Sequence, residues 1–186
     1  MTVDEIFSHA CTHMVEGVMV HLQMSDYFNF LGLKGYYLCH RYHYYEENNN
    51  YLELSNYYLT HYNKIPVDNK INNPQIIPEN WYKYTRQDVD NSTRKASIQQ
   101  GFEKWINWEK QTKAFYVRLY EELLALNEVA ASTELERYIK DVDYELAEAE
   151  QILLELKALD FNVSDIILEQ DKICKDYKKR IKEIEL

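Results

Sequence analysis

The sequence is poor in the residues that interrupt helices. Its 186 residues include only 4 glycines and 3 prolines. Folds built from many short strands need frequent turns, and glycine and proline mark most turns. Their scarcity therefore argues against an all-β fold and favours long helices. All three prolines, at positions 66, 74 and 78, fall within one segment from Asn63 to Asn91.

Cysteine is scarce, and acidic residues outnumber basic ones. The three cysteines, Cys11, Cys39 and Cys174, are an odd number without CxxC spacing, which predicts reduced thiols and a cytoplasmic protein. The formal net charge of -10 disfavours a nucleic-acid partner, because such a surface repels phosphate. A signal-peptide pattern and an uncharged apolar run of membrane-spanning length are both lacking, so we expect no association with a membrane.

Apolar residues make up 46% of the chain and recur at steps of three and four, the period of a helix with one buried face. A capping box of Thr133 and Glu136 is expected to begin the fourth helix, and Ser164 or Asp165 to cap the fifth. The pattern predicts five helices, at about Thr2–Phe30, Tyr36–Tyr62, Ser92–Leu126, from the Thr133 box to Leu159, and Ser164–Ile184.

The segment from Asn63 to Asn91 is unusually long for a connection inside a compact domain. Short turns join the first helix to the second and the third to the fourth, so each pair forms an antiparallel hairpin. The long segment can cross the whole bundle, which would make the second and third helices parallel. We therefore expect an all-α four-helix bundle with one long crossover in residues 1–160. Residues 161–186 form a C-terminal helix packed on the bundle or extending from it.

Three carboxylates interrupt the apolar stripes near the middle of three different helices: Glu47, Glu109 and Glu145. A lone buried carboxylate costs several kcal/mol unless it is paired, protonated or bound to a metal. His21 faces inward on the first helix, and His43 lies one turn before Glu47 on the second. Carboxylates and imidazoles together suit iron or manganese, so these residues predict a metal site.

Short motifs in this order resemble those of the ferritin family. Bacterial ferritins carry a glycine before the second helix and a Glu-Glu pair about three turns later, which is similar to Gly35 followed by Glu46 and Glu47. The family motif in the third helix resembles Trp108-Glu109-Lys110. The segment from Tyr138 to Leu156 is similar to the family's ligand-bearing stretch in the fourth helix, with Asp143 and Glu145 at or beside its polar ligands.

The resemblance spans about Val3 to Leu159 and implies a ferritin-like, non-haem iron protein with a di-metal site. Glu47, Glu109 and either Asp143 or Glu145 would be ligands, and an intact site would oxidise ferrous iron. The chain departs from the family at two positions. Asn50 stands where a histidine is expected, and Met14 where the first helix carries a glutamate. The resemblance then implies that Glu16, His21 or His43 substitutes, or that the centre is vestigial and holds no metal.

Two other interpretations stay open. The chain can be a metal-free ferritin-like protein that works by assembly or by binding a protein partner, because its 17 tyrosines suit interfaces. It can also be a coiled-coil-like scaffold without the bundle. Cys11, Val18 and Leu22 extend the apolar arc of the first helix beyond one stripe, which predicts a homo-oligomer, at least a dimer.

Overall fold

The structure is a computed structural model, and it describes residues 1–67, 70–72, 74–78, 81 and 83–184. Within these residues the chain is helical, with extended and turn segments between helices and no strand. A short 3₁₀ helix, η2, spans Arg86–Asp88. The α-helices are α1 (Val3–Phe30), α2 (Lys34–Tyr62), α3 (Asn91–Ala125), α4 (Val129–Ala158) and α5 (Val163–Ile184).

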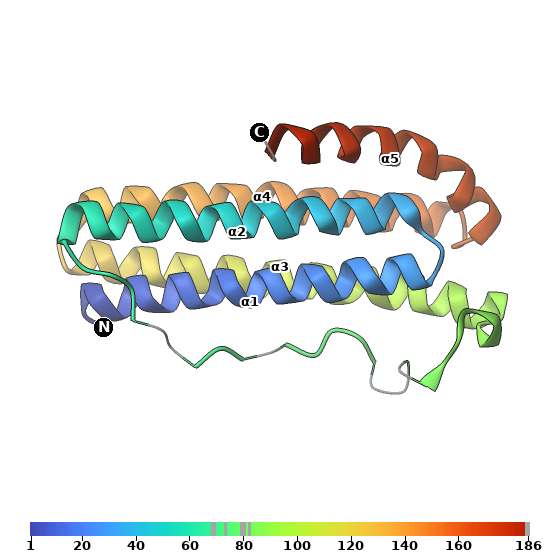
Figure 1. Cartoon of the computed structure of the whole chain (residues 1–186), viewed down its shortest axis with the longest axis horizontal. Helices are drawn as coiled ribbons and strands as arrows, with labels where there is room; N and C mark the ends of the chain where they lie inside the picture. Colours follow the sequence, from blue (N-terminus) through green and yellow to red (C-terminus); the bar gives the residue numbers. More distant parts are fainter. Residues whose placement is uncertain (68–69, 73, 79–80, 82, 185–186) are drawn as a thin grey trace.

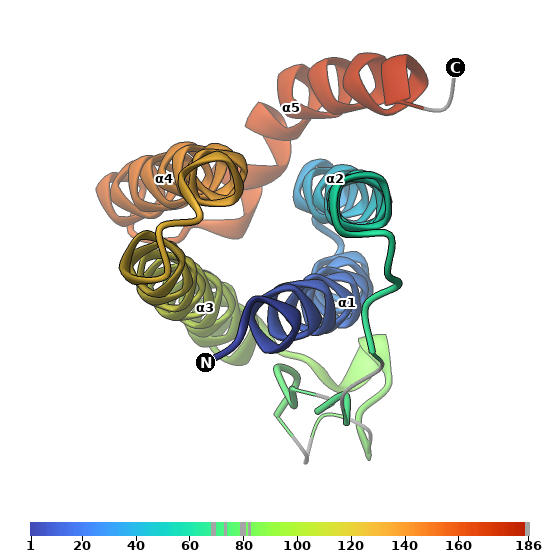
Figure 2. The ribbon, with the colours of Figure 1, turned by 90° about the vertical axis from the view of Figure 1, so that its left-hand side faces the viewer.

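The connectivity agrees with the crossover that the sequence predicts. Figure 1 shows α1 and α2 as one antiparallel hairpin and α3 and α4 as another. Between the hairpins, the chain returns along the full length of the bundle, so α2 and α3 run in the same direction. Figure 2, viewed along the bundle, shows the four helices arranged around one common interior. None of the helices that the structure describes has both the length and the apolar character to cross a membrane.

The first helix begins where its sequence signals predict. Thr2 caps α1: its hydroxyl accepts the Glu5 backbone N–H, and the Glu5 carboxylate accepts the Thr2 backbone N–H in return. This reciprocal pair satisfies two amide groups that the first helical turn leaves free.

The capping box expected at Thr133 and Glu136 is wrong. Helix α4 already begins at Val129, and the Thr133 hydroxyl donates to the Val129 carbonyl inside the helix, at 3.0 Å. Glu136 pairs with Lys140 instead. The turn is completed early because Asn127 adopts a left-handed conformation with φ of 61°, which asparagine tolerates better than most residues.

Helix α5 folds back over α2 (Figure 1). Neither Ser164 nor Asp165 precedes it as expected. The helix begins at Val163, and the Asn162 side-chain oxygen accepts the Ser164 N–H. The Gln170 side-chain oxygen accepts the Gly35 backbone N–H at the start of α2, where a β-carbon in place of the glycine hydrogen would lie 2.8 Å from that oxygen. Glycine at position 35 therefore permits the close approach of α5.

Two separate apolar clusters fill the bundle. One lies toward the turn between α1 and α2 and contains Phe28, Phe102 and Trp105. The other lies toward the N-terminus of α1 and contains Phe7, Met14 and Tyr116. The two clusters are separated by about two turns along α3 and α4 and by about four turns along α2. These turns carry Glu109, Glu145 and Glu47. The polar layer occupies the middle of the bundle, where the sequence places its interior carboxylates.

Candidate metal centre

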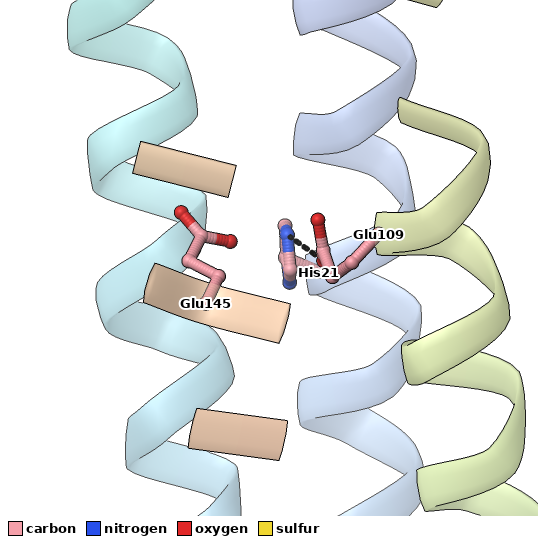
Figure 3. A group of neighbouring side chains, drawn as sticks. All are labelled: His21, Glu109 and Glu145. Carbon is pink, nitrogen blue, oxygen red and sulfur yellow. Dashed lines mark ion pairs between the residues drawn. The ribbon is translucent and has the colours of Figure 1, made fainter. Parts of the chain in front are cut away.

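One residue from each of three helices meets in the polar layer: His21 of α1, Glu109 of α3 and Glu145 of α4 (Figure 3). Their ligand atoms all lie within 4.8 Å of one another. His21 is fully buried and Glu109 is 1% exposed, whereas the Glu145 side chain is 14% exposed. We call these three residues the inner group. Their spacing is suited to a single cation held between helices that are far apart in the sequence.

Polar atoms of the inner group lack partners. His21 Nε2 and Glu109 Oε2 are buried and make no hydrogen bond within the described part of the chain. The nearest approach of the pair, from His21 Nε2 to Glu109 Oε1, is 3.8 Å, which is too long for a hydrogen bond. Leaving such groups unsatisfied costs about 1–3 kcal/mol each. A bound cation would satisfy both atoms, so the residues fit a metal ion.

Neighbouring side chains fix the orientation of two members of the inner group. His21 Nδ1 lies 3.1 Å from His40 Nδ1, so one of these nitrogens donates to the other. If His21 Nδ1 carries the proton, its Nε2 keeps a free lone pair directed toward Glu109. The indole N–H of Trp105 donates to Glu109 Oε1 at 2.8 Å, which leaves Oε2 available. Partners of this kind commonly orient metal ligands.

The electrostatics of the layer favour a cation. Burial raises the pKa of Glu109 well above its usual value, and the charges of Glu145 and Glu47 raise it further. Burial and the charge of Glu145 likewise raise the pKa of Glu47. Burial lowers the pKa of His21 to about 3, so its imidazole is neutral at physiological pH. A divalent cation would stabilise the ionised form of these carboxylates and could accept the lone pair of the neutral imidazole.

Glu47 lies beside the inner group rather than within it. Its side chain is 7% exposed and packs against Gly17 of α1. A β-carbon at Gly17 would lie 2.7 Å from Glu47 Oε1, closer than such contacts allow, so the glycine makes room for the carboxylate. Gly17 thus lets a buried carboxylate approach the first helix, in addition to letting the helices pack closely.

A second set of ligand atoms lies on the other side of Glu145. His43 and Glu46 of α2 join Glu145 with their ligand atoms within 4.8 Å of one another, and we call these residues the outer group. His43 Nδ1 is 3.1 Å from Glu46 Oε2 and 3.5 Å from Glu145 Oε2. Burial, the largest single effect, lowers the pKa of His43, but Glu145 and Cys39 together raise it well above its usual value.

Two of the residues expected as ligands lie elsewhere. Asp143 is exposed and pairs with Lys113, because two positions from Glu145 correspond to about 200° around the helix. Glu16 lies against the crossover segment, where its Oε1 accepts the Asn72 backbone N–H at 2.8 Å. Its Oε2 lies 3.6 Å from His13 Nδ1.

Met14 and Asn50 are both outside the inner group. Met14 is fully buried in the apolar cluster, away from the polar layer. The Asn50 backbone carbonyl accepts the Tyr138 hydroxyl at 3.4 Å. The histidine that the layer uses from α1 is His21, two turns after Met14. His40 and Glu148 also lie beside the histidines of the layer. Glu148 could have been found from the sequence, because it is three residues after Glu145 and so lies on the same helix face.

Known structures share this arrangement of helices. A form of the Archaeoglobus fulgidus ferritin engineered to be closed matches with a TM-score of 0.75 and 16% identity, covering 94% of this chain and 96% of that chain. The chain has a ferritin-like fold. A humanised archaeal ferritin matches with a TM-score of 0.75 and 17% identity, covering 92% of this chain and 94% of that chain.

The open-pore ferritin of the hyperthermophilic archaeon Archaeoglobus fulgidus gives a TM-score of 0.74 at 17% identity, covering 92% of this chain and 94% of that chain. No protein-family model and no curated protein sequence matches the chain. At such low identity the similarity to these ferritin structures establishes the fold alone. The chemistry depends on the residues of the polar layer.

Proposed function

We propose that this ferritin-like chain binds ferrous iron at the inner group. The observation that carries the proposal is the convergence of His21, Glu109 and Glu145 from three helices, with buried ligand atoms that have no hydrogen-bond partner in the described residues. Glu47 adds a further buried carboxylate beside them. One imidazole and several carboxylates suit iron and also manganese. The ferritin-like fold favours iron over manganese.

Ferrous iron is the substrate or cargo in this proposal, and its chemistry would be oxidation to ferric iron by oxygen or peroxide. The protein's part is to bind and to balance charge. His21 would donate its Nε2 lone pair, and Glu109 and Glu145 would supply carboxylate oxygens. The carboxylates stabilise the higher charge of ferric iron more than that of ferrous iron, which favours oxidation. Iron storage or iron oxidation is accordingly the role that we assign.

The first prediction concerns the affinity for iron. Replacing Glu109 by Gln keeps the shape of the side chain and removes its charge. We expect the affinity for ferrous iron, measured by anaerobic isothermal titration calorimetry, to fall by at least about tenfold, the lower range found when outer partners of metal ligands are removed. Glu150→Gln is the matched control, because Glu150 is half-exposed and pairs with Lys110 on the bundle surface.

The calorimetric result separates the proposal from its rival. If the native chain binds no ferrous iron, or if the Glu109 and Glu150 variants bind it equally well, the inner group does not hold iron. The alternative of a metal-free protein that acts by assembly or by binding a protein partner would then be favoured.

The second prediction concerns assembly, and we propose a homo-oligomer of at least two chains. Large apolar side chains are exposed on α4 and α5: Tyr144 is 77%, Leu168 76% and Leu154 63% exposed. Large exposed apolar side chains on these two helices suit an interface between chains. Light scattering is expected to give a mass that is a multiple of 22.4 kDa. A mass of one chain at every concentration tested would contradict this prediction.

We also propose that the protein is cytoplasmic and does not bind nucleic acid. A cytoplasmic location agrees with three free, buried cysteines, and the net charge of -10 disfavours nucleic acid.

A further inference from the structure

A small cavity of about 170 Å³ lies between the C-terminal part of α1 and the crossover segment. The crossover runs beside α1 in both Figure 1 and Figure 2. The cavity is lined by three residues of α1 and two of the crossover, namely Asp26, Tyr27, Phe30, Ile77 and Trp81. Because a cavity of about 150 Å³ can hold a molecule of the size of benzene, this one has room for a small organic group.

Three aromatic rings form walls of the cavity. The Trp81 ring meets the Tyr27 ring at 78°, with centroids 5.4 Å apart, and the Phe30 ring at 88°, with centroids 5.6 Å apart. Walls at nearly right angles let one small group contact more than one ring. Aromatic faces attract cations. Within the described residues no arginine lies over these three rings, so no internal cation uses this attraction.

A carboxylate completes the lining. Asp26 is exposed and makes no ion pair within the described part of the chain. The guanidinium of Arg86 is directed to the Asn29 carbonyl oxygen, at 3.0 Å, rather than to Asp26. The cavity thus offers a cation one counter-charge and few hydrogen-bond acceptors. A protonated amine would leave N–H groups unsatisfied there, whereas a cation without N–H groups would not.

Hydrogen bonds hold the walls of the cavity in place. Gln23 Nε2 donates to the Pro74 carbonyl at 2.8 Å, and Gln23 Oε1 accepts the Ile76 backbone N–H at 3.1 Å, so α1 binds the crossover just before it reaches the cavity. The Tyr27 hydroxyl donates to the Ser97 carbonyl of α3 at 3.1 Å, which fixes its ring. Walls that are ordered in advance reduce the entropy that is lost when a ligand binds.

We propose that this cavity binds a small quaternary ammonium cation of the choline type. The trimethylammonium group would contact the rings of Trp81, Tyr27 and Phe30, and Asp26 would balance its charge. Such a cation carries no N–H group, and aromatic faces are well suited to recognise it. The lining residues of α1 lie more than one turn beyond His21, so the site is separate from the inner group and does not depend on iron binding.

The test is a titration of the whole chain with choline chloride, followed by isothermal titration calorimetry. The matched probe is the uncharged alcohol in which a carbon atom replaces the nitrogen of choline. We expect choline to bind saturably and about tenfold more tightly than this alcohol, because only the cation is attracted by the ring faces and by Asp26. No saturable binding of choline, or equal affinity for the two probes, would overturn the proposal.

Two variants remove walls of the cavity. Trp81→Leu and Phe30→Leu should each weaken choline binding by about tenfold. Trp81 is buried and Phe30 is half-buried, so Phe30→Leu keeps the test valid if Trp81→Leu disturbs the fold. Tyr84→Leu is the matched control, because its ring contacts Trp81, with centroids 5.5 Å apart, without lining the cavity. If Phe30→Leu binds choline as tightly as Tyr84→Leu does, the proposal is wrong.

Asp26→Asn tests the counter-charge. It should weaken choline binding by about threefold, as expected for an exposed ion pair, and leave binding of the alcohol unchanged. Asp171→Asn, at an exposed position of α5, should alter neither. Equal choline affinities in the two variants would remove the role of Asp26.

Vesicles of phosphatidylcholine distinguish a free cation from a lipid head group of the same chemistry. We expect the chain to stay in the supernatant when these vesicles are pelleted, because the proposed ligand is a small free cation. Co-sedimentation with the vesicles, in a chain that does not bind free choline, would overturn the proposal in favour of a lipid surface.

Discussion

Replacing Glu109 by Gln is expected to stabilise the metal-free protein at neutral pH. The pKa of Glu109 is raised well above its usual value by burial and by the charges of Glu145 and Glu47. The folded chain therefore binds a proton that the unfolded chain releases above its ordinary pKa. The stability that such a group contributes is fully present below its pKa in the unfolded chain and is lost as the pH rises toward its pKa in the folded chain. Gln cannot ionise, so the variant does not lose stability in this way.

The difference between the two proteins should grow with pH. One group contributes at most about 1.4 kcal/mol per pH unit between its unfolded and its folded pKa. Urea unfolding of the metal-free proteins at pH 5 and pH 7.5 measures it, with Glu150→Gln as the surface control. We expect the Glu109 variant to gain stability relative to the native chain as the pH rises over this range, by no more than this slope allows. A constant difference across the range would show that Glu109 is ionised in the folded protein throughout.

Replacing Trp105 by Ala should destabilise the folded protein more than any other single substitution beside the polar layer. Trp105 is fully buried in the apolar cluster, and its ring lies edge-on to His40 with centroids 4.5 Å apart. Removing so large a side chain typically costs about 3–5 kcal/mol, through lost burial and the cavity that remains. The same change also removes the N–H donor of Glu109 Oε1. Thermal or urea unfolding of the metal-free protein measures the effect.

Two further variants divide this effect into its parts. Trp105→Phe keeps an aromatic ring in the cluster but removes the donor, and we expect a loss of about 1–3 kcal/mol from the unsatisfied carboxylate oxygen and the smaller ring. Leu52→Ala, at a residue that is 55% exposed, should change stability by less than about 0.5 kcal/mol. If Trp105→Ala were as mild as Leu52→Ala, the cluster would not support the layer as described.

The fold could be predicted from the sequence because its signals are regular and local. Apolar spacing placed the helices with end points close to those observed, and the proline-bearing segment indicated the crossover that makes α2 and α3 parallel. The start of α4 could not be read correctly. A Thr and a Glu three residues apart also occur inside helices, so the pattern at Thr133 does not by itself mark a helix start. Asn127, whose left-handed conformation ends the turn, is a weaker signal in the sequence.

The site was only partly predictable, for a geometric reason. Interior carboxylates stand out when they interrupt an apolar stripe, so Glu47, Glu109 and Glu145 were recognised as buried candidates. Which of these carboxylates can bind the same cation depends on how the helices are rotated and shifted along the bundle axis relative to one another. The apolar pattern of a single helix does not encode that arrangement. The structure accordingly places Glu109 and Glu145 in the inner group with His21, while Glu47 packs on Gly17. The hydrogen bond from Tyr177 of α5 to Glu148 likewise depends on how that helix folds back.

Anomalous diffraction from crystals grown with ferrous iron under anaerobic conditions tests the central claim most directly. Data collected on either side of the iron absorption edge locate the metal without reference to activity. The account predicts an iron peak bounded by His21 Nε2 and the carboxylates of Glu109 and Glu145. A polar layer without such a peak, in crystals whose iron lies only at surface carboxylates such as Asp143, would contradict it.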